Sequence, residues 1–155
     1  MKHADIANSL LEDMVVLDHE PFKDKEDMFD FMTQKFEDCN IVSDAKIFKE
    51  ALEERESQGP TYMGNMIAIP HGKCKEVLEP GIGFCRCKEP FIYESCGESG
   101  EVKYIFVLAI SDHQANDYHL RVLSTLAGML AHDEFWEVLK RVNTFKELQE
   151  GIKDL

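Results

Sequence analysis

The sequence predicts a single α/β domain with a mixed, mostly parallel sheet flanked by helices. Short runs of apolar and β-branched residues alternate with longer segments in which apolar residues recur at helical spacing. Strands separated by helices need crossover connections, which favour a parallel or mixed sheet. The chain has 155 residues, a common size for one hydrophobic core, and no repeat or linker divides it. We therefore expect one domain over residues 1–155.

The first third of the chain predicts one strand and two helices. The run MVVL at 14–17 is rich in β-branched residues and is followed by polar residues and a proline that end the strand. Apolar residues recur at helical spacing over 24–37, where acids fill the first turn. A second helix is expected over 44–56, with Ser43 as its cap. Its buried side is expected to carry Ile47, Phe48, Ala51 and Leu52.

The middle of the chain predicts four strands. Two short ones are expected at 61–63 and 66–69, with an exposed loop at 70–72 directly after them. Two more are expected at 81–87 and 102–110. The last of these is almost continuously apolar, as in a strand buried on both faces, so we expect it at the centre of the sheet. The polar section between these two strands, 94–101, is of ordinary loop size.

The C-terminal third predicts three helices. One is expected over 117–131 and another over 133–142. The residues from Thr144 to Glu147 form a capping-box pattern that opens a final short helix. The buried side of the first of these helices is expected to carry Leu120, Leu123, Leu126, Ala127 and Leu130.

Composition excludes several classes of function. The net charge is −13, and nucleic acids and anionic membranes are bound chiefly by lysine and arginine, so we expect neither as a partner. No stretch approaches the roughly 18 apolar residues of a membrane helix, and the N-terminus lacks the apolar run of a secretory signal. The five cysteines are odd in number and irregularly spaced, which argues against disulfides. We expect a cytoplasmic protein without direct membrane insertion, metal or other cofactor.

The stretch MGNMIAIPHG at 63–72 carries the clearest chemical signal. An apolar strand leads through Pro70 to His71, and the proline restricts the backbone around it. Gly72 removes side-chain bulk beside the imidazole. A histidine with a pKa near 6.5 is mostly neutral at pH 7 and keeps a nitrogen lone pair for attack. A histidine of this kind can accept a phosphoryl group, but the three residues Pro70, His71 and Gly72 alone also fit a surface loop histidine with no chemical task.

This stretch resembles the active-site signature of the fructose and mannitol class of enzyme IIA domains, which belong to the bacterial phosphoenolpyruvate-dependent sugar phosphotransferase system. The signature has an acidic or amide residue, then an apolar residue and glycine, and then an apolar-Ala-apolar-Pro-His-Gly run. The resemblance extends to the strand at 102–110 and to the HLRVLSTLAGML helix, so it covers nearly the whole chain. Here the signature positions are Glu56, Met63, Gly64, Ile67, Ala68, Ile69, Pro70, His71 and Gly72.

The resemblance implies that His71 is loaded from the phosphocarrier protein HPr and unloaded onto a cysteine of a IIB component. Sugar is then phosphorylated during uptake through the membrane component IIC and is not bound by this chain. His119 matches the second active-site histidine of the family, and it would contact the phosphoryl group and orient the ring of His71. Arg55 matches an arginine near the phosphorylation site of the mannitol branch, and its guanidinium fork suits phosphate oxygens.

Two further residues are candidates for supporting the phosphoryl group. Thr61 would supply a hydroxyl, although a threonine that opens a strand is more often there for backbone geometry. Asn65 stands where several mannitol-type domains carry a glutamate. Its amide can still hydrogen-bond a ring nitrogen or a phosphate oxygen. This departure favours a fructose-like substrate over mannitol.

Three alternative interpretations stay open at this stage. A metal site would use His71, Cys74, Cys85 and Cys87, although their spacing matches structural zinc sites poorly. A regulatory domain would keep the same phosphohistidine but act in a phosphorelay instead of sugar uptake. A binding module without phosphoryl chemistry, as in the cytoplasmic part of anion exchangers, would share the fold alone.

Overall fold

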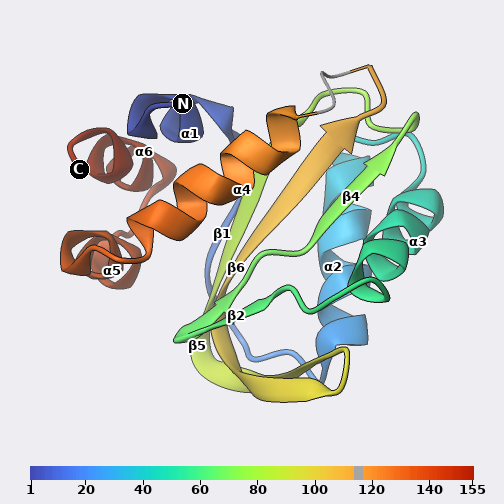
Figure 1. Ribbon diagram of the computed structural model, residues 1–155, viewed down its shortest axis with the longest axis horizontal. Helices are drawn as coiled ribbons and strands as arrows, with labels where there is room; N and C mark the ends of the chain where they lie inside the picture. Colours follow the sequence, from blue (N-terminus) through green and yellow to red (C-terminus); the bar gives the residue numbers. More distant parts are fainter. Residues whose placement is uncertain (114–116) are drawn as a thin grey trace.

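The computed structural model describes residues 1–113 and 117–155, in which a six-stranded sheet separates two groups of helices (Figure 1). No helix in these two ranges is long and apolar enough to span a membrane. In chain order the elements are α1 His3–Ser9, β1 Leu10–His19, α2 Lys25–Asp38, α3 Ala45–Glu56, β2 Tyr62–Gly64, β3 Met66–Ala68, β4 His71–Cys74, β5 Gly81–Ser95, β6 Glu98–Ser111, α4 Tyr118–Met129, α5 Asp133–Arg141 and α6 Phe145–Lys153.

The sheet is mixed and mostly parallel, as the sequence predicts. Its strand order is β1-β5-β6-β3-β2, and β4 also pairs with β6. The pairs β1–β5, β3–β6 and β4–β6 are parallel, whereas β2–β3 and the β5–β6 hairpin are antiparallel. The central position predicted for 102–110 is confirmed, because β6 has β5 along one edge and both β3 and β4 along the other.

Each face of the sheet has its own hydrophobic core. The two cores follow from the alternation of side chains along β6, which is apolar at successive positions and so supplies both faces. Tyr104, Phe106, Leu108 and Ile110 pack with α1, α4, α5 and α6. Ile105, Val107 and Ala109 pack with α2 and α3. The two helix groups lie on opposite sides of the strands in Figure 1.

The prediction of an exposed loop at 70–72 is wrong. The carbonyl of Pro70 accepts a hydrogen bond from the N–H of Leu108 at 3.0 Å, and His71 pairs with Leu108 in the β4–β6 ladder. Although proline cannot donate to a ladder, it can still accept, so the chain continues along β6 after a short break. His71 is therefore held in a strand with 7% of its surface exposed.

Other differences concern element ends. The loop predicted at 94–101 is a hairpin in which β5 and β6 run almost to the turn, where Cys96 and Gly97 have positive φ. The predicted cap Ser43 is wrong, because Asp44 accepts from the N–H of Ile47 at 3.1 Å. Helix α1 carries only a short apolar segment and was not predicted. The cap at Thr144 is confirmed, since its hydroxyl accepts from Glu147 N–H at 3.1 Å.

Three side chains predicted to be buried are exposed. They are Ile47 on α3, which is 37% exposed, Leu120 on α4, which is 58% exposed, and Ala127, also on α4. Ile47 and Leu120 lie on helix faces that border open space, beside the buried Phe48 and Val122 that contact the sheet. Apolar residues at helical spacing are compatible with more than one buried face of a helix. Packing against the strands determines which of these faces is buried.

Candidate functional site

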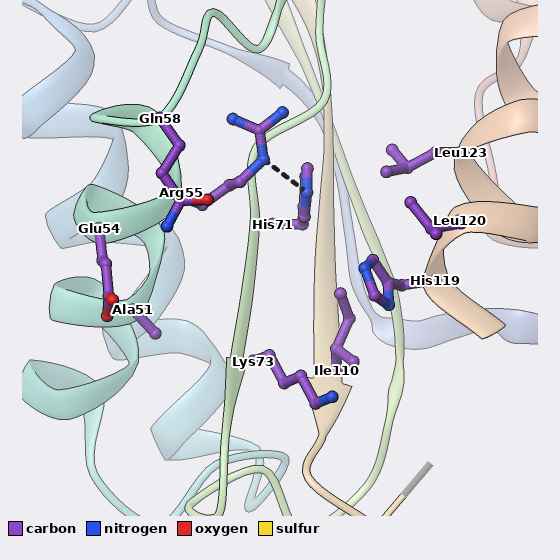
Figure 2. A pocket seen from close by; sticks show the side chains of 10 residues that line it. All are labelled: Ala51, Glu54, Arg55, Gln58, His71, Lys73, Ile110, His119, Leu120 and Leu123. Carbon is purple, nitrogen blue, oxygen red and sulfur yellow. Dashed lines mark hydrogen bonds between the residues drawn. The ribbon is translucent and has the colours of Figure 1, made fainter. Parts of the chain in front are cut away.

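An open cavity of about 420 Å³ lies where α3, β4 and α4 meet. Figure 2 shows its lining, with α3 on one side of His71 and α4 on the other. The strand β4 contributes His71 and Lys73, which share one face because strand side chains alternate. The remaining lining residues are Ala51, Glu54, Arg55, Gln58, Ile110, His119, Leu120 and Leu123.

Both ring nitrogens of His71 have partners, and these partners define its tautomer. The Nε of Arg55 donates to Nε2 of His71 at 3.1 Å. Because an arginine can only donate, Nε2 must be the nitrogen with the lone pair. The other nitrogen, Nδ1, lies 3.2 Å from the carbonyl of Ile69 and so carries the hydrogen. The nucleophilic lone pair thus points toward the guanidinium at the cavity.

Arg55 reaches this position from the last turn of α3. Its Nη1 also donates to the carbonyl of Gly59 at 2.9 Å, which fixes the plane of the guanidinium. The close approach of α3 to β4 depends on Gly72. A Cβ there would lie 3.1 Å from the backbone nitrogen of Leu52. The predicted role of Gly72 is therefore corrected: its missing side chain makes room for α3 and not for the imidazole.

His119 lies across the cavity in the first turns of α4. Its ring centroid is 6.3 Å from that of His71, and the two rings are inclined by 36°. Among the described residues, none is a hydrogen-bond partner for the buried Nδ1 of His119. The three residues predicted as the centre of the site, His71, His119 and Arg55, are thus brought together by three different elements (Figure 2).

The electrostatics of the cavity favour the neutral form of both histidines. Burial lowers the pKa of His71, the neighbouring Arg55 and His119 lower it further, and the Ile69 carbonyl and Glu56 oppose the shift. Burial also lowers the pKa of His119, aided by the charges of Lys73 and Arg55. Neutral imidazoles beside permanent cations suit a site that receives an anion.

Neither Thr61 nor Asn65 lines this cavity, although Thr61 borders a second, smaller hollow together with Arg55 and His71. The hydroxyl of Thr61 is bonded to Glu56 and to the hydroxyl of Tyr93, so it is directed into a buried network and not toward a phosphoryl group. Asn65 is exposed in the turn between β2 and β3, with φ of 50°, and does not line the cavity. The strand β3 separates this turn from His71, so the expected contact of Asn65 with the site is corrected.

Lys73 is one of the cavity residues that the sequence analysis missed. It stands two residues after His71, on the same face of β4. The period of two along a strand would have identified it, but 70–72 was predicted as a loop.

The alternative metal site is not assembled by the fold. His71 faces the α4 side of β4, whereas Cys85 and Cys87 are buried in the core formed with α2. Within residues 1–113 and 117–155, no group of three or more histidine, cysteine or acidic side chains is arranged to hold a metal ion.

The chain is similar to known proteins in both sequence and fold. The family model "Phosphoenolpyruvate-dependent sugar phosphotransferase system, EIIA 2" matches residues 8–155. The chain is 36% identical over 112 residues to the fructose-specific EIIABC component of Bacillus subtilis, covering 72% of this chain but 17% of that relative. It is 28% identical to the fructose-specific EIIA component of Haloferax volcanii, covering 88% and 87%. The crystal structure of nitrogen regulatory protein IIA-Ntr from Neisseria meningitidis has a TM-score of 0.79, 29% identity and coverage of 95% and 98%.

Proposed function

The chain belongs to the EIIA type 2 family of the phosphoenolpyruvate-dependent sugar phosphotransferase system, and on this basis we propose that it is a phosphoryl carrier that uses His71. The observation that carries the proposal is the tautomer of His71, which places the lone pair of Nε2 at an open cavity whose charged lining residues are Arg55, Lys73 and Glu54. In the proposed reaction this lone pair attacks a phosphorus atom. The N–P bond to His71 forms while the donor's bond to phosphorus breaks, and the electron pair of that bond stays with the donor.

Arg55 has two tasks in this proposal. In the free protein its Nε–H occupies the lone pair of Nε2, so the bond must open before attack. The same guanidinium then lies beside the new phosphoryl group and donates to its oxygens. The carbonyl of Ile69 keeps its bond to Nδ1–H and stabilises the positive charge that the ring gains as the N–P bond forms.

His119 and Lys73 complete the cavity on the side of α4. The unpartnered Nδ1 of His119 is a buried polar atom that a phosphoryl oxygen or a reoriented ring would satisfy. The ammonium of Lys73 supplies charge where the protein as a whole is strongly acidic, with a net charge of −13. Phosphoryl transfer depends mainly on such positioning and charge compensation.

The proposed partners follow from the family. Phosphate would come from phosphorylated HPr in the cytoplasm, and it would leave to a cysteine of a IIB component coupled to a membrane IIC. Two relatives are named as fructose-specific components, which supports a sugar of the fructose class. The chain spans 17% and 20% of the first two relatives, both EIIABC components, so the other functions of those proteins lie in parts that this chain does not match.

The test is incubation of the protein with labelled phosphoenolpyruvate, enzyme I and HPr. We expect one label that is labile in acid and stable in alkali, as a phosphohistidine is, and we expect none on His71→Ala. The variant should stay folded, because His71 is at the edge of the sheet. Retention of label by folded His71→Ala would refute the assignment of His71, and absence of label on the folded wild-type protein would favour the binding module.

A regulatory role is a second candidate function. It is favoured by the similarity to IIA-Ntr from Neisseria meningitidis and to a nitrogen regulatory protein of Klebsiella oxytoca, which is 32% identical over 111 residues. Loading of His71 would be the same in both cases, so the discriminating step is unloading. Rapid transfer of label to a fructose-type IIB cysteine supports uptake, whereas a loaded protein that does not discharge to IIB supports regulation.

A further inference from the structure

Glu56 is a buried carboxylate directly behind the site. It is the last residue of α3 and is 5% exposed. The negative end of the helix dipole lies at this position, so an anion is disfavoured there even before the cost of burial is counted. Burying it without complete hydrogen bonding would be strongly unfavourable. A buried carboxylate at this position is therefore expected to be stabilised by hydrogen bonds from the groups around it.

Four side chains from three other parts of the chain surround this carboxylate. Oε1 accepts from the hydroxyl of Thr61 and from that of Tyr93 at 3.0 Å. Oε2 accepts from Ser95 Oγ at 2.7 Å and from Lys25 Nζ at 3.4 Å. Burial, followed by the charge of Glu56, raises the pKa of Tyr93, so its hydroxyl remains a donor. Three hydroxyls and one ammonium thus surround the two carboxylate oxygens, both of which are acceptors, and the hydroxyls of Thr61 and Tyr93 also lie 2.8 Å from each other.

One route from this network leads to Nδ1 of His71. The backbone N–H of Thr61 also donates to Ser95 Oγ at 2.9 Å, so Thr61 is held through both its side chain and its backbone. The carbonyl of Thr61 accepts from the N–H of Ile69 at 2.9 Å. The carbonyl of Ile69 in turn pairs with Nδ1 of His71 at 3.2 Å. The position of this last carbonyl is therefore fixed from the network.

A second route leads to Nε2 of the same ring. Arg55 precedes Glu56 in the last turn of α3, and its Nε donates to Nε2 of His71. Anchoring Glu56 to β5 through Tyr93 and Ser95 anchors this turn as well. Both nitrogens of His71 are thus bonded to groups whose positions depend on one carboxylate.

We propose that Glu56 is a positioning residue that selects the tautomer of His71 with hydrogen on Nδ1 and the lone pair on Nε2. The inference rests on the proposed function of His71 as the phosphoryl acceptor. It assigns Glu56 no contact with the phosphoryl group. Its effect reaches the ring through Thr61 and Ile69 on one side and through Arg55 on the other.

The decisive variant is Glu56→Gln, which keeps the shape of the side chain. An amide has one oxygen and an NH₂ donor, so it cannot accept from all four partners. The tautomer is read from the ¹⁵N chemical shifts of the His71 ring at a pH where the ring is neutral. We expect the Nδ1–H form to dominate in the wild-type protein and a mixture of both tautomers in Glu56→Gln. Phosphoryl acceptance should fall by about fivefold or more, as expected for the loss of one ordinary hydrogen bond.

Two further variants make the test specific. Glu50→Gln makes the same chemical change at an exposed position of α3, and it should leave the tautomer unchanged. Thr61→Val removes only the hydroxyl that links the network to the strand. It should shift the tautomer of His71 in the same direction as Glu56→Gln. If Glu56→Gln does not fold, the tautomer measured in Thr61→Val is the test of the proposal.

The outcomes separate this inference from the proposed function. A folded Glu56→Gln protein with reduced stability but an unchanged tautomer and transfer rate would show that Glu56 is structural only, and so would an unchanged tautomer in Thr61→Val. A shifted tautomer in a protein whose wild-type form takes no label would support the hydrogen-bonded route while refuting the carrier function.

Discussion

The protonation of His71 is set by its place between Arg55, His119 and the backbone of Ile69. Burial is the largest cause of its lowered pKa, so the folded protein binds a proton at His71 less tightly than the unfolded chain does. A neutral ring with a free lone pair consequently persists to a lower pH than in an exposed histidine. For a carrier that must accept phosphate, this extends the pH range of the reactive form.

We predict that the ring of His71 titrates below its ordinary value of 6.5. In the range between the folded pKa and 6.5 the unfolded state binds more protons, so stability rises with pH there and is lost as pH falls. Titration of the ring by NMR, together with urea unfolding between pH 5 and 8, measures both effects. The pH dependence should be weaker in His71→Gln, and a midpoint at or above 6.5 would contradict the prediction.

We also predict that His119→Ala slows phosphoryl transfer more than it weakens the fold. The side chain is half-buried at the wall of the cavity, and its Nδ1 makes no hydrogen bond to a described residue, so little structure depends on it. Its loss should slow acceptance by about 100-fold or more, in the range of a positioned polar group. Stopped-flow transfer rates and urea unfolding test this, and an unfolded variant would show that His119 is structural.

At the scale of elements, the site depends on the distance between α3 and β4. A Cβ on Gly72 would lie 3.2 Å from both Ala51 Cβ and Phe48 Cε1, in addition to its contact with Leu52. Contacts this short require α3 to move outward by a few tenths of an ångström. Because Arg55 lies in the last turn of α3, such a movement would lengthen its bond to His71.

We therefore predict that Gly72→Ala destabilises the protein by about 1–3 kcal/mol, the usual cost of overpacking. It should also slow acceptance by His71. The matched control is Gly128→Ala in α4, where a Cβ meets nothing within 4 Å. There the same change should stabilise by about 0.5–1 kcal/mol, because alanine is a better helix former. Equal effects of the two variants on unfolding by urea would contradict this account.

The sequence predicts the elements better than it predicts their contacts. Periodicity identifies α2, α3, β6 and the start of α6, because each carries a regular apolar or capping pattern over several residues. Periodicity does not predict the strand after Pro70. A proline normally indicates the end of a strand, but here its carbonyl accepts a hydrogen bond from β6 and so continues the ladder. Periodicity also fails for Ile47 and Leu120, since spacing alone does not choose which helix face meets the sheet.

In the candidate site too, the sequence predicts which residues take part better than it predicts their contacts. The motif locates His71, and the resemblance locates Arg55 and His119, which the fold then brings together. The network of Glu56 could not be predicted from spacing, because Tyr93 and Ser95 come from β5 through long-range pairing. For the same reason, the direction of the Thr61 hydroxyl was visible only in the structure.

At the scale of the molecule, the site lies at the boundary between the two cores. The strand β4 borders the sheet along β6, so His71 can be reached by Arg55 from the helix group on one face and by His119 from the group on the other. A side chain on a central strand can be reached only from the face to which it points, because the neighbouring strands separate the two faces of the sheet. The relative position of the two helix groups therefore determines the geometry of the cavity.

Arg86 joins parts of the molecule that are remote from the cavity. This buried side chain on β5 donates to the carbonyls of Leu139 at 3.0 Å and Val142 at 2.6 Å, at the end of α5. It also pairs with Asp18 of β1 at 3.0 Å. The carbonyls at the C-terminal end of a helix have no N–H donors within the helix. Arg86 provides donors for these carbonyls of α5 and thereby fixes α5 to the sheet.

We predict that Arg86→Met lowers the free energy of unfolding by about 2–5 kcal/mol, because it leaves buried carbonyls without donors. Lys88→Met is the matched control on the same strand. It removes a cation that pairs with Glu20 where both side chains are more than half exposed, so its effect on the free energy of unfolding should be much smaller. Urea unfolding of both variants measures the difference. Phosphoryl acceptance per folded molecule should be unchanged in Arg86→Met, since Arg86 does not line the cavity; a loss of acceptance without loss of stability would instead show that the attachment of α5 controls the site.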